Sequence, residues 1–168
     1  TSRFATTCKE HSMAELNILE LLKSDDSENI REGAYLAGKE RLGEAIPLLV
    51  THVQNPDIGV QEAADRALRK IGGPQVANAM IPLLRSEDAP VRNIAMDMLR
   101  EVGATDIDSL FQLLQDSDPD MRIFAADILG STGTVLAVAP LRGALLRDPE
   151  VNVRYQAAVS LGNLAYPE

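Results

Sequence analysis

Apolar residues along this chain recur three and four positions apart, in short segments separated by polar turns. The clearest example runs through residues 107–114, breaks at the turn 116–120 and resumes over residues 121–129. Apolar side chains at this spacing share one face of an α-helix, and Pro119 in the turn lacks the N–H that would continue a helix. The segment therefore predicts two helices joined by a short turn, with Gly133 near the end of the second.

The same helix-turn-helix pattern occurs five times. Each copy places Arg or Gln directly after an apolar residue, with an Ala three positions further on. The residues are Ile30-Arg31, Val60-Gln61, Val91-Arg92, Met121-Arg122 and Val153-Arg154, followed by Ala34, Ala64, Ala95, Ala125 and Ala157. Successive pairs lie 30 to 32 residues apart. A period of this length is typical of stacked helical repeats, which bury their apolar faces against their neighbours.

We therefore predict an all-α fold of about five stacked helix-turn-helix repeats, because no segment combines alternating apolar positions with β-branched residues. The approximate repeat bounds are 13–43, 44–74, 75–104, 105–134 and 135–166. These repeats form one domain over residues 13–168, and residues 1–12 are predicted to be a flexible N-terminal arm.

Two residues depart from the repeat pattern. Gly38 replaces a leucine that fills the space between repeats, and Pro82 predicts a bend inside the first helix of its repeat.

The Arg or Gln of each copy is interpreted as structural. In the last two copies an Asp precedes the Arg by six positions. We expect this Arg to tie the turn to the second helix, by donating hydrogen bonds to that carboxylate and to turn carbonyls. Gln61 keeps the hydrogen bonding but not the charge, which favours a structural role over a catalytic one. The predicted structural ladder comprises Arg31, Gln61, Arg92, Arg122, Arg154, Asp116 and Asp148.

The second helices carry side chains that we expect to face away from the core. Three of them, Ile123, Phe124 and Tyr155, are apolar or aromatic, and such residues ringed by polar groups are typical of protein interfaces. The alternative is that these three pack between neighbouring second helices. The full set, named the second-helix row, is Tyr35, Glu62, Arg66, Asn93, Asp97, Ile123, Phe124, Asp127, Tyr155 and Gln156.

Charge and cysteine content narrow the possible functions. The chain has 16 Lys and Arg against 25 Asp and Glu, a formal net charge of −9, which weighs against binding to nucleic acids and to anionic membranes. Aromatic residues make up only 4% of the chain, so the core is predicted to be aliphatic. Cys8 is the only cysteine, and no apolar run is long enough to cross a bilayer. We therefore predict a cytoplasmic protein.

The sequence shows no arrangement typical of an enzyme. Cys8 and His11 supply too few ligands for a zinc site. His52 stands where other copies have a leucine, and it is predicted to be partly buried and hydrogen-bonded. The acidic clusters at 25–28 and 116–120 lack the calcium-binding loop pattern and are interpreted as helix N-caps. We therefore predict no catalytic residue, no metal site and no cofactor.

The segments 45–49, 116–122 and 148–158 resemble HEAT-type repeats, and more narrowly the short bacterial HEAT-like repeat also found in phycobilin lyase subunits. The resemblance extends from Met13 to Ala165. It implies a right-handed α-solenoid, a superhelix whose second helices line a concave face where partners dock.

These features favour a non-catalytic scaffold or adaptor that binds a protein or peptide on that concave face, through the second-helix row. We expect no nucleic-acid partner and no membrane partner, and either a monomer or a segment of a longer repeat protein. The resemblance leaves one alternative, an accessory subunit related to the phycobilin (chromophore) lyases. A nucleic-acid enzyme on a HEAT-like scaffold fits less well, because the chain is acidic and has no Trp.

Overall fold

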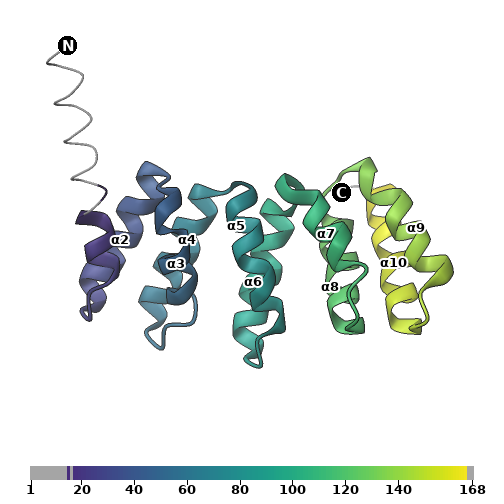
Figure 1. Cartoon of the computed structure of the whole chain (residues 1–168), viewed down its shortest axis with the longest axis horizontal. Coiled ribbons are helices and arrows are strands. Elements are labelled where there is room, and N and C mark those ends of the chain that lie inside the picture. Colours follow the sequence, from purple (N-terminus) through teal and green to yellow (C-terminus); the bar gives the residue numbers. More distant parts are fainter. Residues whose placement is uncertain (1–14, 16, 166–168) are drawn as a thin grey trace, which may run out of the picture. The chain divides into compact units, whose positions relative to one another are not determined.

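The computed structural model describes residue 15 and residues 17–165. Across this part of the chain all regular structure is helical and there is no β-strand, so the all-α prediction is confirmed (Figure 1). The predicted arm at 1–12, with Cys8 and His11, lies outside the described residues. The chain divides into two compact units, residues 1–79 and residues 80–168, and each unit is described by itself.

Unit 1 consists of a helical segment at 17–22 followed by longer helices joined by short turns. Its elements are α2 (Ser27–Glu40), the 3-10 helix η1 (Gly43–Ala45), α3 (Ile46–His52), α4 (Ile58–Ile71) and α5 (Gly73–Met80), whose last residue already belongs to unit 2. Helix α4 packs against both α2 and α3. Short first helices and 14-residue second helices therefore alternate along the chain.

Aspartates begin the second helices of unit 1. The Asp26 carboxylate accepts a hydrogen bond from the backbone N–H of Glu28 at 2.7 Å, and the Asp57 carboxylate accepts one from Gly59 at 2.8 Å. These bonds satisfy N–H groups that have no partner in the first turn of a helix. In unit 2, Asp118 accepts from the N–H of Asp120 in the same way. The acidic clusters therefore act as helix N-caps, as the sequence predicted.

Small residues allow α2 and α4 to lie close together in unit 1 (Figure 1). Ala34 and Ala64 are fully buried. A Cβ atom at Gly38 would lie only 2.9 Å from the Cα of Ala67, which is closer than two carbon atoms can approach. Gly38 departs from the leucine pattern for this reason: the backbone of the next second helix occupies the space that a side chain would need.

His52, the last residue of α3, links this helix to the preceding helical segment at 17–22. It is partly buried, and its Nε2 donates a hydrogen bond to the carbonyl oxygen of Leu22 at 2.7 Å. The prediction of a partly buried, hydrogen-bonded histidine is confirmed.

Unit 2 repeats the same arrangement of short and long helices (Figure 1). Helix α8 packs against α6, α7 and α10, and α10 packs against α9. The elements of unit 2 are η2 (Ile81–Arg85), α6 (Ala89–Val102), η3 (Gly103–Asp106), α7 (Ile107–Leu113), α8 (Pro119–Ser131), η4 (Val135–Ala137), α9 (Val138–Arg147) and α10 (Val151–Ala165). A bend was predicted at Pro82; there α5 ends at Met80 and a 3-10 helix begins at Ile81, so the helix changes type beside the proline.

The core of each unit is aliphatic, as the composition predicted. Leu68 in unit 1 and Leu99 and Leu129 in unit 2 are fully buried at corresponding positions of their second helices. Leu161 occupies the same position in α10 but is only partly buried. A fully buried leucine stabilises the fold by about 2–3 kcal/mol, so each of these three leucines stabilises the core of its own unit.

The helix ends follow the sequence expectation in part. Gly72, which ends α4, has a φ of 61° and a ψ of −164°, a positive-φ conformation that glycine adopts without strain. Helix α2 ends at Glu40, three residues before Gly43. Arg41 takes the left-handed conformation there instead, with a φ of 51°.

Candidate interaction surface and the arginine clamp

Three arginines of unit 2 hold their turns in the same way. In Arg92, Arg122 and Arg154, Nη1 donates to the two carbonyl oxygens that lie six and five residues earlier in the chain, over 2.6 to 3.2 Å. A guanidinium suits this arrangement because its donors are fixed in one plane. We call this contact the arginine clamp. It ties the turn between two helices to the start of the second helix.

The corresponding residues of unit 1 differ. Gln61 donates from Nε2 to the carbonyl oxygen of Val53 at 2.7 Å, so it keeps the tie to the turn without a charge. Arg31 donates to Glu28 in its own helix, and its Nη1 lies 4.0 Å from an Asp57 carboxylate oxygen. Arg31 therefore contacts side chains where Arg92 and its equivalents contact the backbone.

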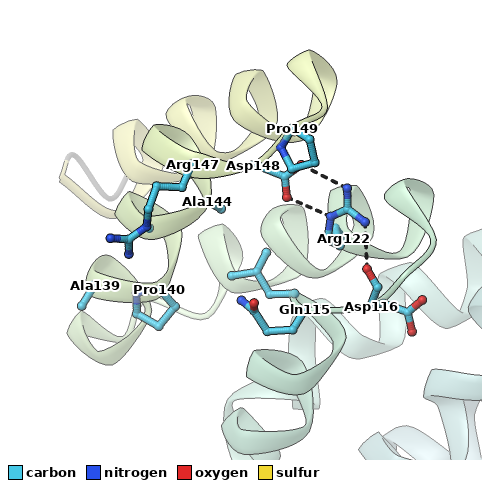
Figure 2. A pocket seen from close by; sticks show the side chains of 11 residues that line it. Gln115, Asp116, Arg122, Ala139, Pro140, Ala144, Arg147, Asp148 and Pro149 are labelled. Atoms are coloured by element: carbon cyan, nitrogen blue, oxygen red, sulfur yellow. Dashed lines mark hydrogen bonds and ion pairs between the residues drawn. The ribbon is translucent and has the colours of Figure 1, made fainter.

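The predicted pairing of carboxylates within one copy is wrong. Asp148 accepts hydrogen bonds from Nε and Nη2 of Arg122 in the preceding copy, at 2.8 and 3.1 Å, and not from Arg154 (Figure 2). Asp116 likewise pairs with Arg85 of the preceding copy instead of Arg122. The reason is geometric: the turn carbonyls occupy Nη1 of Arg122, so its Nε and Nη2 edge points toward the next turn.

Burial makes the Arg122–Asp148 pair different from a surface ion pair. The two side chains are only 11% and 7% exposed. Burial opposes ionisation of the Asp148 carboxyl, but the hydrogen bonds from Arg122 and from the N–H of Glu150 outweigh it and lower its pKa. The Asp116 pKa is also lowered, first by a hydrogen bond from the backbone N–H of Asp118 and then by Arg85.

These lowered pKa values predict a loss of stability in acid. The unfolded chain titrates its aspartates near pH 3.9, so it takes up protons before the folded protein does as the pH falls. The stabilisation from Asp148 and Asp116 is complete above that value and is lost as the pH falls toward their folded pKa values. Urea unfolding between about pH 3 and pH 7 measures this. The Asp148→Ala variant should show a shallower acid dependence than the wild type, and an unchanged slope would contradict the assignment.

The clamp at Arg122 also forms one wall of a groove in unit 2 with a volume of about 430 Å³. Helix α9 supplies the other wall through Ala139, Pro140 and Arg147, and Gln115 lies between them (Figure 2). Because Arg122 and Asp148 bond each other, their charges are already neutralised inside the groove. Arg147 is the exposed charged group that remains there.

None of the residues in the second-helix row is buried. Tyr35 is 61% and Tyr155 is 70% exposed, and Glu62, Arg66, Asn93 and Asp97 are also exposed. The remaining members are partly buried: Ile123, Phe124, Asp127 and Gln156. Ile123 and Phe124 are therefore partly covered, and Phe124 lines a groove with Leu84 and Arg85 of η2, whereas Tyr155 stays exposed.

Polar members of the row in unit 2 bond one another through Arg100, a residue that the sequence analysis did not single out. Arg100 donates to Asp97 at 2.7 Å and to Asp127 at 2.6 Å, and Gln156 also donates to Asp127 at 3.1 Å. The spacing of Asp97 and Arg100, three residues apart on one helix, was the available signal. This network links the second helices α6, α8 and α10 across the surface.

Unit 1 holds a second groove, between α2 and α4, with a volume of about 320 Å³. Tyr35 and Arg66 of the second-helix row line it. The other two cations at this groove are Arg31, which was predicted to belong to the structural ladder, and Lys70, which no sequence pattern singled out. Lys70 Nζ lies 5.4 Å from the centre of the Tyr35 ring, within the range of a cation–π contact.

Paired helices with clamped turns and an exposed row on the second helices define the chain as a helical repeat protein. The sequence model of HEAT repeats matches residues 15–100 and 107–168. The chain belongs to the HEAT repeat family, as the sequence predicted.

The most informative relative is a HEAT repeat-containing taxis protein of Halobacterium salinarum, 28% identical over 155 residues. The match covers 89% of this chain and 35% of that protein, so the chain spans about a third of the relative's length.

Solved structures with similarity to the chain include two with described functions. Human deoxyhypusine hydroxylase in complex with glycerol is 18% identical, with 92% of this chain and 74% of that chain covered and a TM-score of 0.49. The CpcE–CpcF complex of phycocyanin lyase from Nostoc is 22% identical, with coverage of 89% and 64% and a TM-score of 0.48. An engineered protein is 23% identical, with coverage of 90% and 79% and a TM-score of 0.45.

The described residues contain neither a membrane-spanning helix nor a group arranged to bind a metal. No helix there combines the length and the apolar content required to span a bilayer. No group of three or more His, Cys, Asp or Glu side chains in that part of the chain is arranged to hold a metal ion.

Proposed function

We propose that this chain is a non-catalytic scaffold or adaptor that binds a protein or peptide along the second-helix row. The observation that carries the proposal is the exposure of Tyr35 and Tyr155, at 61% and 70%. Aromatic side chains supply much of the binding energy at protein interfaces, where polar groups surround them. Tyr35 lies on the second helix α2 beside Arg66 and Lys70. Tyr155 lies on the second helix α10, with the exposed Val151 and Val159 one turn to either side. Each unit therefore offers one aromatic anchor.

The surroundings of the tyrosines support this role. Arg66 and Lys70 lie beside Tyr35 in unit 1, and Gln156 follows Tyr155 on α10. These polar groups can bond a partner's backbone or side chains while the rings bury apolar surface. We further propose a cytoplasmic location, and a monomer or a segment of a longer repeat protein.

Photo-crosslinking tests the proposal. Benzoylphenylalanine is placed at Tyr35 or Tyr155 in the chain expressed in its own cells, and crosslinked products are identified by mass spectrometry. Leu146, an apolar residue of α9 that is 66% exposed and not in the row, is the matched control position. We expect discrete crosslinks to a protein partner from the row and none from position 146. Equal labelling from all three positions, or none from the row, would show that the row is not a docking surface.

A further inference from the structure

We propose that the groove between α2 and α4 of unit 1 binds an acidic segment of a partner protein through its carboxylate side chains. The proposal rests on the interaction function above and names the chemistry of the partner at one part of the row. Its evidence comes from the shape of the groove, from the cations around it and from the charge of the rest of the chain.

The groove has a floor of small residues and a rim of large ones. Ala34, Ala63 and Ala67 are buried or nearly so and form its base. The side chains that rise around them are Arg31, Tyr35, Arg66 and Lys70. The groove has a volume of about 320 Å³, which leaves room for side chains of an extended peptide.

Two of the rim cations are available to a ligand. Arg66 and Lys70 are four residues apart on α4, so they lie on the same face of the helix. Both are exposed, and neither forms an ion pair within the described part of the chain. Arg69, between them in sequence, differs because it pairs with Asp65 at 2.9 Å. A guanidinium and an ammonium one turn apart can bind two successive carboxylates.

Tyr35 gives the groove an apolar wall. Lys70 lies over its ring, with Nζ 5.4 Å from the ring centre, which holds the ammonium beside the groove. Tyr35 as a whole residue stays 61% exposed. It therefore offers a flat surface to the methylene groups of a bound glutamate, while the cations bind its carboxylate.

The acidic residues near the groove do not cancel its positive charge. Glu28 pairs with Arg31 at one end. Glu62, one turn before Arg66, is exposed but does not line the groove. The groove therefore retains the positive charges of Arg66 and Lys70.

The basic character is specific to this pair of helices. In the next copy the residues at the positions of Arg66 and Lys70 are Asp97 and Glu101, and the copy after that has Asp127 and Ser131. The chain as a whole carries a formal charge of −9. An acidic segment is therefore repelled by most of the molecule and attracted to this groove, which supplies specificity through charge.

Fluorescence anisotropy of the full chain with a labelled poly-glutamate peptide tests the inference. We expect binding at about 20 mM NaCl that weakens about tenfold by 200 mM, because exposed charges are screened. The double variant Arg66→Glu/Lys70→Glu should weaken binding by about tenfold or more, and Tyr35→Ala by about threefold. A poly-lysine peptide of the same length is attracted to the acidic remainder of the chain, so the Arg66→Glu/Lys70→Glu variant should not weaken its binding.

The matched control is Arg142→Glu/Arg147→Glu, which changes two exposed cations of α9 in unit 2 and alters the net charge equally. It should keep poly-glutamate binding within about twofold, and circular dichroism verifies that all variants fold. An equal loss of poly-glutamate binding in both double variants would show that net charge alone, and not the groove, determines binding. Tighter groove-dependent binding of an oligonucleotide, or groove-dependent self-association, would assign the groove to nucleic acid or to a second copy and overturn the proposal.

The two proposals fail separately. If crosslinks to a protein form at Tyr155 but the groove variants bind poly-glutamate like the wild type, the scaffold function stands and the acidic ligand is wrong. If poly-glutamate binds through Arg66 and Lys70 while no row position crosslinks to a protein, the groove is an anion site and the scaffold function is wrong.

Discussion

Replacing Asp148 by Ala is expected to lower the free energy of unfolding by about 3 kcal/mol. The substitution removes the only carboxylate that bonds the Nε and Nη2 edge of Arg122 in the described chain. It leaves a guanidinium that is only 11% exposed with its charge uncompensated, and an uncompensated buried charge is among the costliest changes in a protein. The N–H of Glu150 also loses its acceptor at the start of α10.

Urea unfolding followed by circular dichroism at neutral pH measures the effect. Because repeat proteins can unfold in steps, hydrogen exchange of α8 and α10 shows whether the loss is local to unit 2. Arg85→Ala is the matched control, since it removes the Arg85–Asp116 pair, in which Arg85 is 51% exposed. That variant should lose less than about 1 kcal/mol. Equal losses in the two variants would refute the view that burial sets the value of the Arg122–Asp148 pair.

Gly130→Ala is expected to cost about 2 kcal/mol, by forcing α8 and α10 apart. A Cβ atom at Gly130 would lie 2.5 Å from the Cβ and 2.8 Å from the Cα of Ser160. Ser160 is fully buried and its backbone belongs to α10, so rotating a side chain cannot relieve the clash. The helices must shift, and neighbouring contacts such as the weak hydrogen bond from Gln156 to Ser160 would be strained.

Gly162→Ala provides the control on the neighbouring helix. Gly162 lies in α10, and among the described residues nothing beyond its chain neighbours and its own helix backbone lies within 4 Å of a Cβ built there. Alanine is the better helix former, so this change should be neutral or stabilise by up to about 1 kcal/mol. Thermal unfolding of both variants tests the pair. A destabilisation of Gly162→Ala as large as that of Gly130→Ala would mean that helix propensity, and not close packing, governs these positions.

Local sequence features predicted those parts of the fold that depend on nearby residues. The N-caps at Asp26 and Asp118 follow from an acidic residue placed just before an apolar helical pattern. The irregularity at Pro82 follows from a missing N–H. His52 was predicted to be hydrogen-bonded because it stands at a core position, although its acceptor, Leu22, lies 30 residues away.

The predicted pairing of Asp148 with Arg154 was wrong, because a side chain can have more than one possible partner. Asp148 precedes Arg154 by six residues, and that spacing does bring the Asp148 carbonyl to Arg154. The carboxylate of the same residue bonds Arg122, which lies 26 residues earlier. Spacing along the chain specifies the backbone contact, but it does not specify which guanidinium the next turn approaches.

Periodicity, capping residues and proline placement were sufficient by themselves to predict paired helices, because these features act over a few residues of one chain segment. The HEAT repeat family was predicted from the resemblance of the segments 45–49, 116–122 and 148–158 to such repeats. Only the tertiary structure decided why Gly38 and Gly130 must lack a side chain, since that depends on how closely two backbones approach. It also decided that Arg31 and Tyr35 share a groove with Arg66 and Lys70. These residues come from two helices, and only the packing of α2 against α4 brings their charges together.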